Sequence, residues 1–272
     1  MNSVLYHYCP LDAFLAIIRD REIWLTNIFC MNDSAEHYWL RRVAQDVLRQ
    51  KMKGNADLCS LASMLFPNEE DTDLYCCCLS EEGDSLGQWR AYADDGRGVA
   101  IGLSLDFLRK LSKKYQGLRL QRVVYERREQ ERIVEAIIEP LKGNCPSPAG
   151  GLPEEWTRDL PALVAKGGVW FDAARCKNPC FREEHEFRLI YDPSLATLAP
   201  MSQRRYRSRR DTLVPYYALP LSTDTGAPVI GEIVFGPKSA YKHNEREARK
   251  LLSENGYEDS RVVFRVSEAT YR

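Results

Sequence analysis

Short β-prone runs and longer segments of helical periodicity follow one another along the chain. Apolar runs bounded by turn residues predict strands at residues 4–8, 23–25, 74–79, 99–103, 118–125, 216–221, 230–235 and 262–266, and a further strand ends the segment 181–191. The run 74–79 contains three consecutive cysteines and is apolar on both faces. This pattern is typical of a buried strand at the centre of a sheet.

Helices are predicted where apolar residues recur three or four positions apart. After Pro10, such a pattern joins Leu11, Phe14, Ile17 and Ile18. Other amphipathic segments lie at residues 34–52, 106–114, 126–138, 156–172 and 244–254. Because strands and helices are mixed without an internal repeat or a linker, we expect a single α+β domain over residues 1–272.

Two segments are expected to be surface loops. Residues 144–153 crowd prolines and glycines together and therefore do not form a regular element. Residues 203–211 include five arginines, and like charges packed this closely repel one another, which predicts a mobile basic loop. A patch that contacts a nucleic-acid backbone is the alternative interpretation of this run.

Composition narrows the setting in which the protein works. The 38 basic and 39 acidic residues leave a formal charge of −1, so no field of the whole molecule attracts nucleic acid or anionic lipid. No apolar run approaches a membrane span, and the N-terminus lacks the layout of a signal peptide. Nine cysteines, an odd number, are expected to be reduced thiols. We therefore expect a cytoplasmic protein without a membrane partner.

The first group of candidate functional residues is Glu184, Glu186 and Arg188. In an extended strand, residues two apart project from the same face. Two carboxylates and a guanidinium on one face could bind a ribose hydroxyl or stabilise a cationic transition state. The alternative is a solvated strand face whose salt bridge stabilises the fold by about 1 kcal/mol or less.

Two further groups carry candidate chemistry. His7 lies between Tyr6 and Tyr8 on the first predicted strand, and its imidazole can hold a hydroxyl or transfer a proton, although a structural histidine is the alternative. Ser80 follows the cysteine strand and precedes Trp89 and Tyr92, two aromatic residues that could stack on a planar ring or could equally belong to the core. We expect His7, Ser80 and Glu186 to lie around one cleft.

Known sequence motifs for cofactors and metals are missing from the chain. Cys176 and Cys180 are separated by three residues, but no second pair of Cys or His completes a tetrahedral zinc site. No glycine-rich dinucleotide motif, phosphate-binding loop, nucleophile elbow or HExxH pattern occurs. No metal site is therefore predicted.

Taken together, the motifs resemble the bacterial family catalogued as domain of unknown function 2971. The resemblance extends over nearly the whole chain and is specific in order and spacing. It rests on Tyr6, His7 and Tyr8; Trp24 and Leu25; Asn32, Asp33 and Glu36; Ser80 and Glu81; Trp89, Tyr92, Ala93 and Gly98; Lys177; Glu184, Glu186 and Arg188; and Ile233 and Gly236.

A looser similarity links the chain to ADP-ribosyltransferases. Its basis is the opening Tyr-His-Tyr strand, the apolar helix that follows and the late Glu-x-Glu pair. The resemblance implies an ADP-ribosyltransferase-like fold with a split, mostly antiparallel sheet and flanking helices, and NAD as co-substrate. It also implies that His7 holds the nicotinamide ribose, that Ser80 or Tyr92 supports the nicotinamide, that Glu186 is catalytic and that Glu184 activates the acceptor. The chain departs from that family because no Ser-Thr-Ser motif follows the middle strand.

The candidate site then comprises Glu186, Glu184 and His7 as catalytic residues and Tyr6, His7, Ser80, Trp89, Tyr92 and Arg188 as cofactor-binding residues. The expected function is an NAD-consuming, ADP-ribosyltransferase-like effector in a toxin or phage-defence setting. Its acceptor would be a protein or nucleic acid, and a partner from the same operon would control it. One alternative is a non-catalytic sensor or adaptor of a defence system. The other is a nucleic-acid-processing enzyme with Asp33, Glu36, Glu184 and Glu186 as metal ligands.

Overall fold

The computed structural model describes residues 3–31, 39–51, 73–142, 168–197, 201–222 and 229–271. The chain divides into two compact units. Unit 1 comprises Met1–Thr26, Tyr75–Arg122 and Glu183–Arg272, and unit 2 comprises Asn27–Leu74 and Val123–Arg182. The expected loop at residues 144–153 lies outside the described residues. That residues 1–272 fold as one domain stays a prediction.

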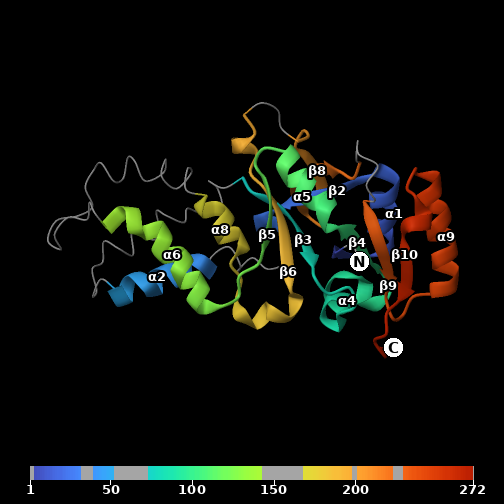
Figure 1. Cartoon of the computed structure of the whole chain (residues 1–272), viewed down its shortest axis with the longest axis horizontal. Helices are drawn as coiled ribbons and strands as arrows, with labels where there is room; N and C mark the ends of the chain where they lie inside the picture. The colour runs from blue at the N-terminus through green and yellow to red at the C-terminus, as the bar shows by residue number, and fades with distance from the viewer. Residues whose placement is uncertain are drawn as a thin grey trace. The chain divides into compact units, whose positions relative to one another are not determined.

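Unit 1 is built on a sheet of ten strands among the described residues (Figure 1). The strands are β1 (Val4–Cys9), β2 (Glu22–Asn27), β3 (Tyr75–Ser80), β4 (Val99–Ser104), β5 (Leu118–Arg122), β6 (Glu186–Tyr191), β7 (Arg205–Arg209), β8 (Thr212–Pro220), β9 (Ile230–Phe235) and β10 (Val263–Val266). Their order is β10-β9-β4-β1-β3-β2-β8-β7, with β6 paired to β3 and β5 paired to β6. The cysteine strand β3 thus has three neighbours, as its apolar faces suggested.

The sheet is mixed but mostly antiparallel. Among the pairs with a defined register, β9 and β10 run parallel and the others antiparallel. The α+β class and the mostly antiparallel sheet predicted from the sequence are therefore confirmed. The finer resemblance to the ADP-ribosyltransferase fold stays a prediction.

The helices of unit 1 bury the two faces of the sheet. Helices α1 (Leu11–Asp20), α5 (Leu105–Lys114) and α9 (Tyr241–Glu254) contribute to one large core, in which Phe14, Phe107 and Leu252 join Leu5 and Cys77 from the strands. Since Tyr6 points away from Leu5, it belongs to the other face. There, Trp89 of α4 (Leu86–Tyr92) packs with Tyr6 and Tyr8.

The described part of unit 2 consists mainly of helices α2 (Trp39–Lys51), α6 (Arg127–Lys142) and α8 (Val169–Arg175). Val43, Val134 and Val169 belong to their common core. The buried side chain of Gln130 accepts a hydrogen bond from the indole of Trp39 at 2.9 Å.

Across the described residues of both units, short 3-10 helices lie at Ile28–Cys30, Asp94–Gly96, Pro179–Glu184, Pro193–Leu195 and Asp259–Arg261.

The basic segment 203–211 departs from its prediction. Arg205–Arg209 is strand β7, and it pairs with β8 through a tight turn at Arg210 and Asp211. The prediction of a loop is thus wrong for Arg205–Arg209, and their mobility stays a prediction. Charge repulsion is offset because Arg205 binds Glu22, with the guanidinium Nη1 2.9 Å from a carboxylate oxygen, and Arg207 donates to the Thr26 hydroxyl at 3.2 Å.

Candidate functional site

Three residues assigned to the site from the sequence share one face of the sheet. Tyr6 of β1 lies opposite Ser80 of β3, and Ser80 lies opposite Glu186 of β6. Directly opposed residues on neighbouring strands point to the same side. Arg188 lies two residues beyond Glu186 on the same strand and points there as well. The predicted common face of Glu186 and Arg188 is therefore present.

Glu186 and Arg188 form a buried, bidentate ion pair. The two Arg188 nitrogens Nε and Nη2 lie 2.7 Å and 2.9 Å from the two carboxylate oxygens of Glu186. The residues are only 4% and 1% exposed. A carboxylate that stabilises charge on a substrate has to reach that substrate. The geometry therefore favours a structural role for this pair over the predicted catalytic role of Glu186, and the pair is not the solvated salt bridge that was the alternative.

Glu184 is not part of the strand that carries Glu186, contrary to the prediction of one extended run. It ends the 3-10 helix Pro179–Glu184, and His185 has a φ of 45° in the left-handed region, so strand β6 begins only at Glu186. The Ser80 hydroxyl donates to the Glu184 carbonyl at 2.7 Å, and the Tyr92 hydroxyl donates to the Glu184 carboxylate at 3.3 Å. Ser80, Tyr92 and Glu184 are thus brought together around a strained turn.

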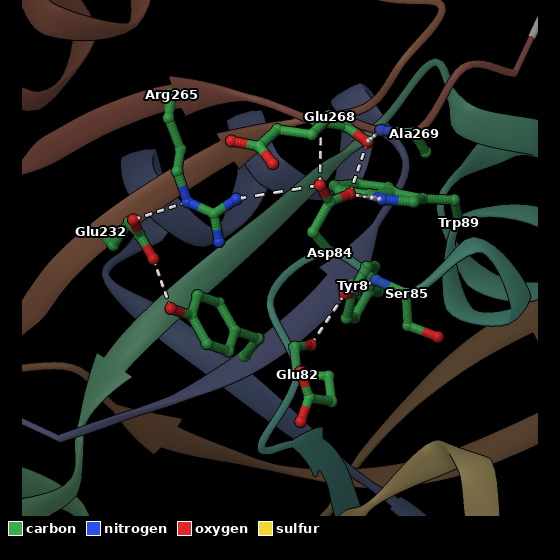
Figure 2. A network of polar contacts seen from close by, with 11 residues as sticks. Tyr8, Glu82, Asp84, Ser85, Trp89, Glu232, Arg265, Glu268 and Ala269 are labelled. Carbon is green, nitrogen blue, oxygen red and sulfur yellow. Dashed lines mark hydrogen bonds and ion pairs between the residues drawn. The ribbon is translucent and has the colours of Figure 1, made fainter.

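Trp89 takes part in a polar network centred on Asp84 (Figure 2). The carboxylate of Asp84 accepts hydrogen bonds from the indole Nε1 of Trp89 at 2.7 Å, from the backbone N–H of Glu268 at 2.7 Å, and from the Ser267 hydroxyl. These contacts tie the residues after β10 to the loop between β3 and α4. The indole of Trp89 is therefore buried and hydrogen-bonded within the protein, which favours the core interpretation over ring stacking.

The network extends from Asp84 to Arg265 and Glu232 (Figure 2). Tyr6 joins it through Glu232. The Tyr6 hydroxyl donates to Glu232, whose other carboxylate oxygen lies 2.7 Å from Nε of Arg265. Burial, with a smaller contribution from Glu232, raises the pKa of Tyr6 to about 12. Gly83 packs on the ring, since a Cβ there would lie 2.5 Å from a ring carbon. These contacts favour a structural role for Tyr6 over the predicted role in cofactor binding.

His7 lies on the face opposite Glu186, because it follows Tyr6 directly in β1. Its Nδ1 is 3.1 Å from the carbonyl oxygen of Cys78 and 3.7 Å from the sulfur of Cys77. The expectation that His7, Ser80 and Glu186 surround one cleft is therefore wrong. Local sequence patterns could not reveal this outcome, because it depends on which residues oppose one another across three strands.

The imidazole of His7 has a defined state. Burial lowers its pKa below the ordinary value of 6.5, so the ring is neutral at pH 7. The Cys78 carbonyl only accepts hydrogen bonds, so Nδ1 carries the proton. The other ring nitrogen, Nε2, is then a hydrogen-bond acceptor that His7 can offer to a ligand.

His7 lines a cavity of about 170 Å³ within unit 1. We call it the His7 cavity. Helix α1 and strands β1, β2 and β7 contribute its lining residues, which are His7, Ala13, Ala16, Ile17, Asp20, Glu22, Ile23, Trp24, Thr26 and Arg207. Apolar walls with a few convergent polar groups are the usual composition of a small-molecule site.

Trp24, Glu22 and Arg207 supply the distinctive chemistry of the His7 cavity. The Arg207 guanidinium lies 5.4 Å from the ring centre of Trp24, and the Trp24 indole donates to Glu22 at 3.1 Å. Sequence reasoning missed Glu22 and Arg207. Glu22 and Thr26 flank the predicted strand 23–25 and alternate with Trp24, which was a usable signal. Arg207 was missed because its segment was interpreted as a loop.

The described residues contain no group of three or more His, Cys, Asp or Glu side chains arranged to hold a metal ion. Asp33 and Glu36 of the metal-enzyme alternative lie outside the described residues. The cysteines for which the structure gives a state are Cys9, Cys30, Cys76, Cys77, Cys78, Cys176 and Cys180, and all are free thiols. Within the described ranges, no helix has both the length and the apolar character needed to cross a bilayer.

Comparison with protein families gives one match. Residues 88–189 match the family described as Protein of unknown function (DUF2971). The resemblance inferred from the sequence is thereby confirmed for this segment, which includes Trp89, Tyr92 and Arg188 but neither His7 nor Trp24. Searches of curated proteins and of solved structures returned no match. The DUF2971 match assigns no chemistry, so a function has to be inferred from the site itself.

Proposed function

We propose that the protein binds NAD with the nicotinamide-ribose end in the His7 cavity and consumes it by releasing nicotinamide. The observation that carries the proposal is the neutral imidazole of His7 in a cavity that Trp24 and Arg207 also line. The activity class comes from the resemblance to ADP-ribosyltransferases.

Each of these groups complements one part of the ligand. The acceptor nitrogen of His7 suits a ribose hydroxyl. The indole face of Trp24 attracts the positively charged nicotinamide ring. Arg207 suits a phosphate. A cavity of about 170 Å³ is smaller than the roughly 300–1,000 Å³ typical of drug-sized ligands, so it would take one end of the dinucleotide.

The catalytic carboxylate in this proposal is Glu22 rather than Glu186. Release of nicotinamide breaks the bond between ribose C1 and the ring nitrogen, and the bonding electrons leave with nicotinamide. Positive charge grows on the ribose, and a carboxylate beside it lowers the barrier. Water or an acceptor hydroxyl then bonds to C1 and gives up a proton to a base. Glu22 lines the His7 cavity, whereas Glu186 is not among its lining residues and is held by Arg188.

The proposal is tested by incubating the full chain with NAD and measuring nicotinamide release by chromatography. His7→Asn keeps a side-chain donor for the Cys78 carbonyl but lacks the Nε2 acceptor, and Glu22→Gln removes the negative charge. We expect each variant to lower the rate about 100-fold or more, the usual loss for a positioned catalytic group. Glu247→Gln on the exposed surface of α9 is the matched control and should keep the parent rate.

Two outcomes would contradict the proposal. One is a parent protein that neither binds NAD nor releases nicotinamide. The other is a pair of results: the His7→Asn protein releases nicotinamide at the parent rate, and the Glu184→Gln protein is inactive. Glu184 does not line the His7 cavity. The second pair of results would place the active site at the turn around Ser80, Tyr92 and Glu184.

A non-catalytic sensor is the second candidate function. It is favoured by the ion pairs that neutralise the cavity carboxylates, because Asp20 is bound by Arg19 and Glu22 by Arg205, each with a nitrogen–oxygen distance below 3 Å. Such pairing weakens a carboxylate's attraction for a cationic transition state. NAD binding that His7→Asn abolishes, without release of nicotinamide by the parent protein, would select this function.

A further inference from the structure

The hairpin of β7 and β8 presents a second chemically distinctive surface. In the described sheet, β7 is the last strand of the order, and β8 is the strand that pairs with it. Tyr206 lies opposite Pro215, and Ser208 lies opposite Leu213, so these four residues share one face of the hairpin. Tyr206 is 55% exposed and Leu213 is 72% exposed. An aromatic ring and an apolar side chain are thus displayed to solvent.

Positive charge flanks that face at the two ends of β7. Five arginines occur between residues 204 and 210, and Asp211 in the turn is the acidic residue beside them. Arg205 and Arg207 point toward Glu22 and Thr26, on the side of the His7 cavity. Arg204 and Arg210 are exposed near the two ends of β7, and the Arg204 guanidinium lies 5.7 Å from the ring centre of Tyr206. The chain's net charge is only −1, so this positive surface is a local feature.

We propose that this hairpin face, which we call the Tyr206 face, binds single-stranded nucleic acid. Exposed aromatic rings flanked by basic side chains are how proteins bind single strands without reading their sequence: bases stack on the rings and phosphates contact the cations. Residues two apart on a strand are about 7 Å apart. Arg204 therefore lies within reach of the phosphate next to a base stacked on Tyr206. The proposal rests on the hairpin alone and is independent of NAD binding.

Two alternative roles for the basic hairpin would not explain the exposed ring of Tyr206. Charged side chains on an edge strand can serve to prevent edge-to-edge aggregation. That role requires no exposed aromatic ring in contact with an arginine. An acidic peptide could also add to the edge of β7 as a strand. It would use backbone hydrogen bonds at the edge and would leave the ring of Tyr206 unused.

Fluorescence anisotropy with labelled oligodeoxythymidine and the full chain tests the proposal. We expect binding whose affinity falls linearly with salt on a double logarithmic plot. Tyr206→Ala should weaken binding roughly 5- to 100-fold through lost stacking. Arg204→Gln and Arg210→Gln should each lower the salt slope by about 1. Arg246→Gln, which changes an exposed arginine on α9, is the matched control and should bind like the parent.

Several results would overturn the proposal. They are the absence of binding at low salt, a Tyr206→Ala protein that binds like the parent, and inorganic polyphosphate or polyglutamate competing as well as unlabelled oligodeoxythymidine. Such competition would show that the surface binds polyanions or acidic peptides in general rather than single-stranded nucleic acid. Tyr206 is exposed, so the melting temperature of Tyr206→Ala should stay near that of the parent, and loss of binding can then be assigned to the ring.

Discussion

Replacing Arg188 with methionine should destabilise the folded protein by about 3–5 kcal/mol, the usual cost of breaking a buried ion pair. The guanidinium of Arg188 holds both carboxylate oxygens of Glu186, and the two residues are 1% and 4% exposed. Methionine fills a similar volume but provides no donor. The Glu186 carboxylate would then lose two charge-assisted hydrogen bonds in the interior. Urea unfolding followed by circular dichroism measures the change.

Arg122→Met is the matched control for this prediction. Arg122 also pairs with a glutamate, with its Nη2 3.0 Å from Glu81, but the side chains are 65% and 36% exposed. Surface pairs of this kind contribute about 1 kcal/mol or less. If Arg188→Met lowered the free energy of unfolding as little as Arg122→Met, the Glu186–Arg188 pair would be solvated in solution. A catalytic role for Glu186 would then be supported again.

Replacing Gly98 with alanine should destabilise the protein by at least about 3 kcal/mol, the upper end of the usual range for overpacking. A Cβ at Gly98 would lie 2.2 Å from the carbonyl oxygen of Cys9 and 3.0 Å from that of Ala93. Both are backbone atoms, so no side chain can move aside. The Gly98 carbonyl also accepts a hydrogen bond from Gly236 at 3.0 Å, which fixes the strand in place. Thermal melting detects the loss.

Gly87→Ala serves as the comparison for Gly98→Ala. Gly87 lies in α4, and the nearest atom to a Cβ there is the Ser85 hydroxyl oxygen at 3.9 Å. Alanine is favoured over glycine in a helix by about 1 kcal/mol, so this variant should melt at or above the parent temperature. A Gly98→Ala protein with the parent stability would show that β1 and β4 are not packed as described.

Local patterns predicted most strands and helices of unit 1. Alternation and apolar runs located β1, β3, β4 and β9 within one or two residues, because each strand is buried on at least one face and bounded by turn residues. The strand β7 was missed because its arginines were considered without the partners that bind them. Glu22 and Thr26 bind Arg205 and Arg207 from a strand about 180 positions away in the sequence.

The candidate site was harder to predict than the fold. Spacing correctly placed Glu186 and Arg188 on one face, but it could not reveal that this face is buried. The left-handed φ of His185 keeps Glu184 out of the strand, and the residue type alone does not predict that conformation. The separation of His7 from Glu186 depends on strand register, which tertiary packing fixes. The His7 cavity joins segments distant in the sequence, so its chemistry became visible only in the fold.

The most direct test of the His7 cavity as the ligand site is nuclear magnetic resonance of the histidine side chains during titration with NAD. The chain has only four histidines, and the spectrum of His7→Asn assigns His7 by the signal it lacks. We predict a neutral His7 ring whose pKa lies below 6.5 and whose signal shifts on addition of NAD, while the signal of His243, which is exposed, stays in place. A His7 signal that titrates with an ordinary pKa and does not respond to NAD would contradict the proposal.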